Sequence, residues 1–161
     1  MDAPEPPDTA AAEAPAKNSP RRDNRAAAMQ FLYMWDINRG DDLPEAMRQF
    51  FGGLEHNREY YSFAEELLHG ALGQLDEIVL LINTNAHNWA FNRIARVDLA
   101  ILRLAIHELL KRRDIPPVVT INEAIELGKM YSTPDSRRFL NGILDKVKDS
   151  LDRPSRTADK A

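Results

Sequence analysis

Hydrophobic side chains recur every three to four residues along most of the chain, a spacing that places them on one face of an α-helix. The pattern predicts helices over residues 20–39, 43–51, 60–72, 75–84, 97–111, 120–132 and 134–151. Between them we find no alternation typical of a β-strand. The sequence therefore predicts an all-α fold, a compact bundle of about seven helices in two packed sub-bundles.

One predicted helix, residues 97–111, is apolar on nearly every side. A helix of this kind is normally the buried centre of a helical domain. Asp98 and Arg103 are among its few polar residues, and we expect this helix to offer a surface to a protein partner.

Helix starts are marked by capping residues. Ser19 followed by Pro20 predicts an N-cap and a proline in the first helical position, where its missing N–H costs nothing. Residues 120–123, TINE, have the form of a capping box. Thr133 and Pro134 repeat the first signal and predict the start of the last helix.

The two ends of the chain differ from the middle in composition. Residues 1–18 consist mostly of Ala, Pro, Asp and Glu, which bury too little to offset the entropy of ordering, so we predict a disordered acidic tail. Residues 153–161 are predicted to fray, which leaves a helical domain over residues 19–152. There is no secretory signal, no apolar run of about 18 residues and no cysteine, a composition that suits the cytoplasm.

The sequence offers little for catalysis. The four histidines, His56, His69, His87 and His107, fall on separate segments without ligand spacing, and we expect surface or boundary positions for them. Glycine-rich phosphate-binding motifs are missing, and we expect no metal and no cofactor. Carboxylates that the fold brings together stay open as a catalytic pair, but the sequence favours a binding protein over an enzyme.

Three arginines near the start of the first helix form the first candidate binding feature. Arg21, Arg22 and Arg25 lie where the helix dipole disfavours cations, so another reason for them is needed. Helical spacing puts Arg22 and Arg25 on one side with Met29 and Tyr33, so guanidinium groups able to grip phosphate lie beside an aromatic ring. The alternative is a solvated basic segment that offsets the acidic tail.

The second candidate feature is at the head of the last helix, where Asp135, Arg138 and Phe139 follow one another closely. Phe139 lies about 100° from the apolar stripe of that helix, so it is at best half buried and could stack on an unpaired base. Alternatively, Phe139 packs against a neighbouring helix.

Several segments in order resemble the NusB family. They are AAAMQFLYMWDIN (26–38), RVDLAILRL (96–104), DIPP (114–117) and, most specifically, TINEAIELGKMYSTPDSRRFLNGILDKV (120–147). The similarity covers about residues 20–150. It implies a transcription antitermination factor that binds boxA RNA of ribosomal RNA leaders as a heterodimer with the ribosomal protein NusE, within an RNA polymerase antitermination complex.

The resemblance also implies roles for residues. Arg21, Arg22 and Arg25 match the arginine-rich start that engages RNA, and Asp135, Arg138 and Phe139 match a second RNA-facing patch. Tyr33 and Asp98 fall where the NusE surface is expected. Asp23 and Asn24 interrupt the arginine run, which would weaken RNA binding without NusE. We expect the first and last helices to form one platform for unpaired nucleotides.

Two alternatives remain. Domains of this family also form the front half of rRNA cytosine methyltransferases, but those need a following nucleotide-binding domain and a cysteine nucleophile, and this chain has no cysteine. The other alternative is a helical scaffold that binds protein only.

Overall fold

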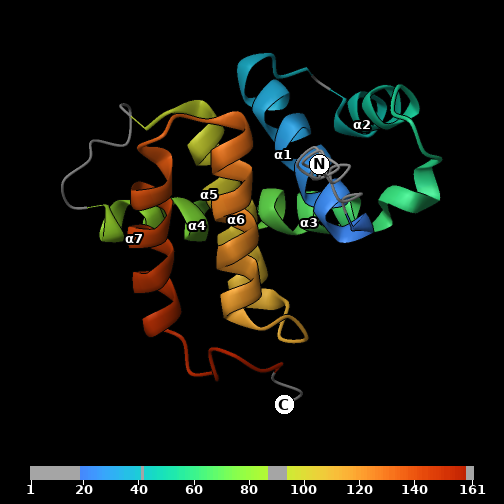
Figure 1. The fold of residues 1–161 in the computed structure, drawn as a ribbon. Coiled ribbons are helices and arrows are strands. Elements are labelled where there is room, and N and C mark those ends of the chain that lie inside the picture. The colour runs from blue at the N-terminus through green and yellow to red at the C-terminus, as the bar shows by residue number, and fades with distance from the viewer. Residues whose placement is uncertain (1–18, 41, 87–93, 159–161) are drawn as a thin grey trace, which may run out of the picture.

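The computed structural model describes residues 19–40, 42–86 and 94–158. These ranges contain seven α-helices and one 3-10 helix, joined by short connections (Figure 1). The elements are α1 (Pro20–Ile37), α2 (Leu43–Gly52), η1 (Arg58–Tyr61), α3 (Ser62–Gly73), α4 (Leu75–Asn85), α5 (Arg96–Lys111), α6 (Pro117–Tyr131) and α7 (Ser136–Asp149). No residue in these three ranges belongs to a strand. The predicted all-α class is confirmed.

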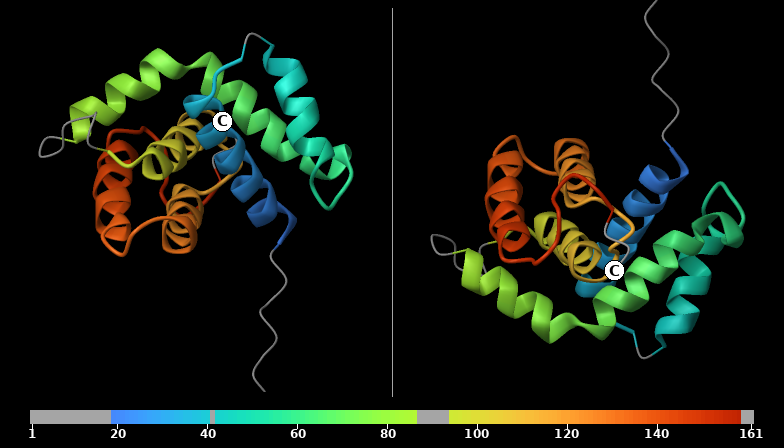
Figure 2. Two further views of the ribbon diagram at one scale, coloured as in Figure 1. Left: turned by 90° about the horizontal axis from the view of Figure 1, so that it is seen from above. Right: turned by 90° about the horizontal axis from the view of Figure 1, so that it is seen from below.

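The helices pack around α5, with α6 and α7 on one side of it and the helices α1 to α3 on another. Figure 1 shows α6 and α7 side by side in front of α5, with α1 and α2 on the opposite flank of α6. In the views from above and below, α3 and α4 follow one another along one edge of the molecule (Figure 2). Large apolar side chains from nearly all of these helices fill one continuous core, among them Phe31, Phe51, Leu67, Ile106 and Leu144.

The prediction that residues 97–111 form the buried centre is confirmed, because α5 is buried along almost its whole length. The polar residues between its two ends, Asp98, Arg103, His107 and Glu108, are buried too, which the sequence pattern did not predict. Arg103 pairs with Asp36 of α1, and both Asp98 and Glu108 bond within the fold. The expectation of a partner surface on this helix is therefore wrong for Arg103, since that guanidinium is held inside.

Helix starts follow the sequence signals in one case and depart from them in two. Ser19 Oγ accepts a hydrogen bond from the backbone N–H of Arg22 at 3.2 Å, which confirms the predicted cap of α1. However, α6 begins at Pro117, so Thr120 lies inside the helix and the predicted capping box is wrong. Likewise α7 begins at Ser136, whose N–H donates to the carbonyl of Thr133 at 3.0 Å.

The chain after α7 packs onto the connection between α5 and α6. The Arg153 guanidinium donates to four backbone carbonyl oxygens, those of Leu109, Arg112, Arg113 and Ile115. The carbonyl of Ser155 accepts from the N–H of Val118 at 3.0 Å. Residues 153–155 therefore differ from the frayed end expected there, because a half-buried arginine satisfies carbonyls at the end of a helix. The acidic tail, residues 1–18, lies outside the described residues.

None of the described helices combines the length and apolarity needed to cross a bilayer.

Candidate nucleic-acid interface

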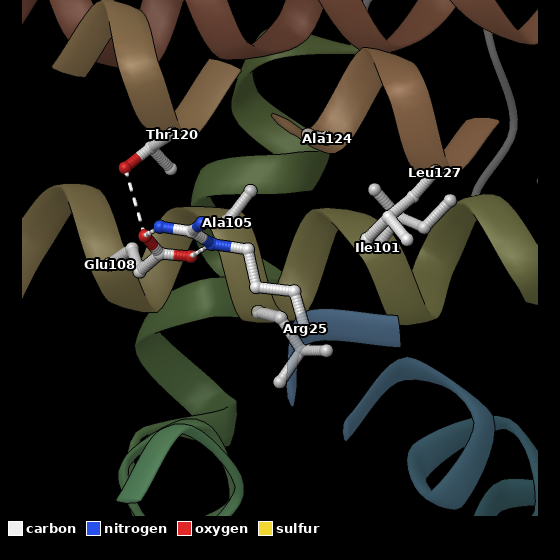
Figure 3. A pocket seen from close by; sticks show the side chains of 8 residues that line it. Arg25, Ile101, Ala105, Glu108, Thr120, Ala124 and Leu127 are labelled. Atoms are coloured by element: carbon white, nitrogen blue, oxygen red, sulfur yellow. Dashed lines mark hydrogen bonds and ion pairs between the residues drawn. The ribbon is translucent and has the colours of Figure 1, made fainter. Parts of the chain in front are cut away.

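Arg25 forms a buried ion pair beneath the start of α6. Its Nε and Nη2 donate to the two carboxylate oxygens of Glu108 at 3.0 and 2.7 Å, and the Arg25 side chain is only 7% exposed. Thr120 Oγ1 donates to the same carboxylate at 3.1 Å. Figure 3 shows Arg25 reaching from α1 toward Glu108 on α5, with Thr120 above on α6. The network ties three helices together.

This placement differs from the expectation that Arg25 faces RNA. Arg25 and Met29 both lie on the inner side of α1, where helical spacing alone had grouped them with Arg22 and Tyr33. Because its guanidinium is paired with the buried Glu108 carboxylate, Arg25 can influence the proposed RNA surface only by positioning α1.

Arg22 remains at the surface, in an ion pair of the same geometry. Its Nε and Nη2 donate to Glu123 of α6, both at 2.9 Å, and the side chain is 37% exposed. The hydrogen bonds from Arg22 hold the pKa of the Glu123 carboxyl below its usual range, and Glu123 in turn raises the pKa of Arg22. An anion that binds Arg22 therefore has to replace a carboxylate already in place.

Arg21 is the most exposed of the three arginines. Half of its side chain is accessible, and its Nη2 lies 3.9 Å from Asp114 in the connection between α5 and α6. Each of the three arginines thus has a carboxylate partner from α5, α6 or the connection between them. These partners lie more than 80 positions further along the chain, so no local pattern identified them.

The two residues that interrupt the arginine run fasten α1 to α3 and η1. Asp23 accepts a hydrogen bond from the Tyr60 hydroxyl at 2.7 Å, which raises the pKa of Tyr60 to about 12. Asn24 is buried, with its amide donating to the carbonyl of Tyr60 and its oxygen accepting from the N–H of Ala64. Both side chains therefore bond within the fold.

The head of α7 presents the second predicted patch. Asp135 and Arg138 are exposed, and Phe139 is half buried, as its position off the apolar stripe predicts. Asp135 and Phe139 line a cleft of about 220 Å³ together with Ile94, Ala95, Asp98, Thr133 and Ser136. Phe139 therefore lies at a cleft while part of its side chain is packed against the core.

Asp98 lies at the base of this cleft, inside the fold. Its Oδ1 accepts hydrogen bonds from Ser132 Oγ at 2.7 Å and from Ser136 Oγ at 2.6 Å. With 6% of its surface exposed, Asp98 holds the turn between α6 and α7 and is not itself an outward contact. This differs from the expectation that Asp98 belongs to a partner surface.

The structure does not bring Arg22 and Phe139 together. Arg22 pairs with Glu123 in the first half of α6, whereas Phe139 follows the opposite end of that helix. Glu123 and Ser132 are about 14 Å apart along the axis at 1.5 Å per residue. In Figure 1, α1 and α7 also flank α6 on opposite sides. The expectation of one shared platform is wrong in this respect, because helical periodicity assigns faces but not the order of helices in the bundle.

Large apolar side chains are exposed on the last turns of α1 and at the end of α6. They are Tyr33, Met34, Ile37, Met130 and Tyr131. Gln30 Nε2 donates to the Tyr131 hydroxyl at 3.0 Å, which joins the two helices at this point. We call these five residues the α1–α6 apolar surface; it contains Tyr33, as expected of a protein-binding face.

Within residues 19–40, 42–86 and 94–158, no three His, Asp or Glu residues cluster as metal ligands. His107 is buried, contrary to expectation, while His56 and His69 are exposed and His87 lies outside the described residues.

Comparison with known proteins gives a consistent result. The sequence profile of the NusB family matches residues 22–149. The chain is 42% identical over 127 residues to the transcription antitermination protein NusB of Trichlorobacter lovleyi, an alignment that covers 79% of this chain and 89% of the relative.

Solved structures agree. A T. maritima NusB structure superposes with a TM-score of 0.74 at 34% identity, covering 89% of this chain and 96% of the other. A crystal structure of the antitermination factors NusB and NusE in complex with double-stranded RNA gives 0.72 at 25% identity, covering 82% and 98%. The matched segment includes α2 to α7 and almost all of α1.

Proposed function

This chain belongs to the NusB family of transcription antitermination proteins, and from that premise we propose that it binds boxA RNA of ribosomal RNA leaders together with NusE. The observation that carries the RNA part is the exposure of Arg21 and Arg22 at the positive end of α1. In this proposal the protein works in the cytoplasm by binding, within the RNA polymerase antitermination complex, and catalyses no reaction.

The head of α1 supplies phosphate contacts. Arg21 and Arg22 project from the first turn, where the helix dipole adds to their attraction for anions. Arg22 can grip a phosphate with two parallel hydrogen bonds, as it now grips Glu123. Arg25 is not part of this surface, because Glu108 holds it inside.

The head of α7 supplies a place for a base. Phe139 borders the cleft described above, with exposed Arg138 beside it in the sequence. Stacking of an unpaired base on an aromatic ring does not depend on which base it is, and an adjacent arginine adds a contact to the backbone. Asp135 lies at the same cleft, where a carboxylate can accept a hydrogen bond from a base.

An RNA that contacts both the head of α1 and the head of α7 has to pass over α6, from the first half of that helix to its end. Since α1 and α7 lie on opposite flanks of that helix, one short stack of bases cannot touch Arg22 and Phe139 together. We therefore propose two contact points on one extended single strand.

The α1–α6 apolar surface is the proposed site for NusE. Tyr33, Met34 and Ile37 recur at helical spacing on an outer face of α1, and Met130 and Tyr131 are exposed at the end of α6, which Gln30 links to α1 through the Tyr131 hydroxyl. Exposed apolar groups of this kind are stabilised by burial against a protein partner. Asp98 supports this face indirectly, because it fixes the turn that follows Tyr131.

The test is a titration of boxA RNA with the wild-type chain and two variants, with and without NusE. Arg22→Ala should weaken binding and lower the slope of log K against log salt by about 0.7, one phosphate contact on a single strand. Phe139→Ala should cost about 1–3 kcal/mol of binding free energy if the ring stacks on a base. Adding NusE should tighten binding by the wild type, because a joint surface has more contacts.

Arg48→Ala is the matched control. Arg48 on α2 also forms an exposed bidentate pair with a glutamate, Glu45, but lies outside the proposed RNA path. A duplex of the same sequence tests the preference for a single strand. Equal binding by the wild type, Arg22→Ala and Phe139→Ala would instead favour a scaffold that binds protein only.

A further inference from the structure

Two arginines from distant parts of the chain converge on one carboxylate at the surface beside α1. Arg112, which follows α5, has its Nη2 2.9 Å from Asp114 Oδ2, and Arg21 Nη2 lies 3.9 Å from the same oxygen. Arg112 Nε also donates to Asp114 Oδ1 at 2.9 Å. One anionic group therefore lies between two guanidinium groups.

An aromatic ring holds both guanidinium groups in place. The Cζ atom of Arg21 lies 4.6 Å from the centre of the Phe63 ring, and that of Arg112 lies 5.2 Å from it. Cation–π attraction of this kind stabilises a guanidinium whose hydrogen-bonding edge remains free to face an anion. The two cations are thus arranged before any ligand arrives.

The anion between them belongs to the chain and is easily displaced. The Asp114 side chain is 55% exposed, and Arg21 is 50% exposed. Hydrogen bonds from Arg112 hold the pKa of Asp114 below its usual range, so the carboxylate is charged at neutral pH. A surface ion pair of this kind contributes at most about 1 kcal/mol, which a multiply charged ligand can outweigh.

We infer that Arg21, Arg112 and Phe63 form a second phosphate-binding site for the RNA backbone, in which Asp114 occupies the position of the phosphate until RNA binds. The inference rests on the proposed function and extends the RNA surface from the head of α1 onto the end of α5. Arg112 supplies a bidentate contact and Arg21 a second cation, while Phe63 positions both. Glu66, 3.1 Å from Arg112 Nη1 and largely exposed, is a further counter-charge for RNA to displace.

The site predicts opposite effects for its two charged partners, which a purely structural ion pair does not. Arg112→Gln should weaken binding of the boxA single strand and lower its log–log salt slope by about 0.7. Asp114→Asn should tighten binding about two- to fivefold, because it removes the competing carboxylate. Arg112→Lys should keep the salt slope near that of the wild type, since the charge is retained.

The pair Arg48 and Glu45 provides matched controls. Arg48→Gln and Glu45→Gln remove the same interaction from an exposed bidentate pair on α2 and should leave RNA affinity unchanged. Thermal unfolding of all variants shows whether each remains folded at the temperature of the titration.

The inference is overturned if Arg112→Gln and Asp114→Asn shift RNA affinity in the same direction, or if neither differs from its α2 control. Failure of the proposed function gives a different result: the wild type itself then shows no salt-dependent binding to the RNA. Tight binding by the wild type with no effect at Arg112 or Asp114 would leave RNA binding intact and refute this site alone.

Discussion

Arg22 and Arg25 lie three residues apart on α1, and each donates two hydrogen bonds to a glutamate, yet their exposure differs. The Arg22 side chain is 37% exposed and that of Arg25 is 7% exposed. Arg25 reaches beneath the start of α6, where Thr120 supplies a third hydrogen bond, whereas Arg22 meets Glu123 one turn further along at the edge. The same pair of residue types thus serves the fold in one place and can serve a ligand in the other.

The physical basis of the difference is the cost of removing one partner. A buried charge left without its counter-charge cannot be solvated, whereas an exposed one is taken up by water. Removing one charge should therefore lower stability at the buried pair of Arg25, and should lower RNA affinity with little change in stability at the exposed pair of Arg22.

The largest expected effect follows from Arg25→Ala. It leaves the Glu108 carboxylate buried with only Thr120 as a partner, and should lower the free energy of unfolding by about 3–5 kcal/mol. Urea unfolding measures it. The double variant Arg25→Met with Glu108→Leu should be more stable than Arg25→Ala, because no unpaired charge remains. A loss below about 1 kcal/mol for Arg25→Ala would mean that the pair is not buried in solution.

A second effect concerns His107, which precedes Glu108 on α5. Its Nδ1 lies 2.7 Å from Gln74 Oε1, and burial lowers the pKa of the ring below its ordinary value of 6.5. The folded state therefore binds a proton less readily than the unfolded state. Stability should be complete above about pH 6.5 and decline as the pH falls toward the pKa of the folded state, by no more than about 1.4 kcal/mol per pH unit.

Imidazole NMR titration measures this pKa directly. An ordinary pKa for the His107 ring would contradict the prediction. His107 is buried against the amide of Gln74 and loses its charge more readily, whereas Arg25 keeps its charge through the ion pair with Glu108.

The smallest effect on stability is expected at Arg22. Removing this partly exposed side chain with Arg22→Ala should change the free energy of unfolding by about 1 kcal/mol or less, because water can take the place of the guanidinium beside the Glu123 carboxylate. The same urea unfolding series measures it beside Arg25→Ala. A loss as large as that of Arg25→Ala would remove the distinction between the two ion pairs.

Sequence periodicity predicted the helices, the buried centre and the half-buried position of Phe139 because these depend on residues close together in the chain. It missed the start of α6, since the Thr120 hydroxyl bonds to Glu108 from another helix and not to its own backbone. For the same reason it could not separate Arg25 from Arg22. Which arginine is buried depends on how α5 and α6 lie against α1, and no local pattern contains that information.

The C-terminal segment has a consequence for how the chain is handled. Arg153 is bonded to the carbonyls of Arg112 and Arg113, next to Asp114, so the far end of the polypeptide braces the loop that faces the first turn of α1. Trimming the protein after α7, or fusing a bulky tag there, would leave the helices intact yet loosen a loop some 40 positions upstream. A preparation shortened in this way would understate the protein's affinity for nucleic acid.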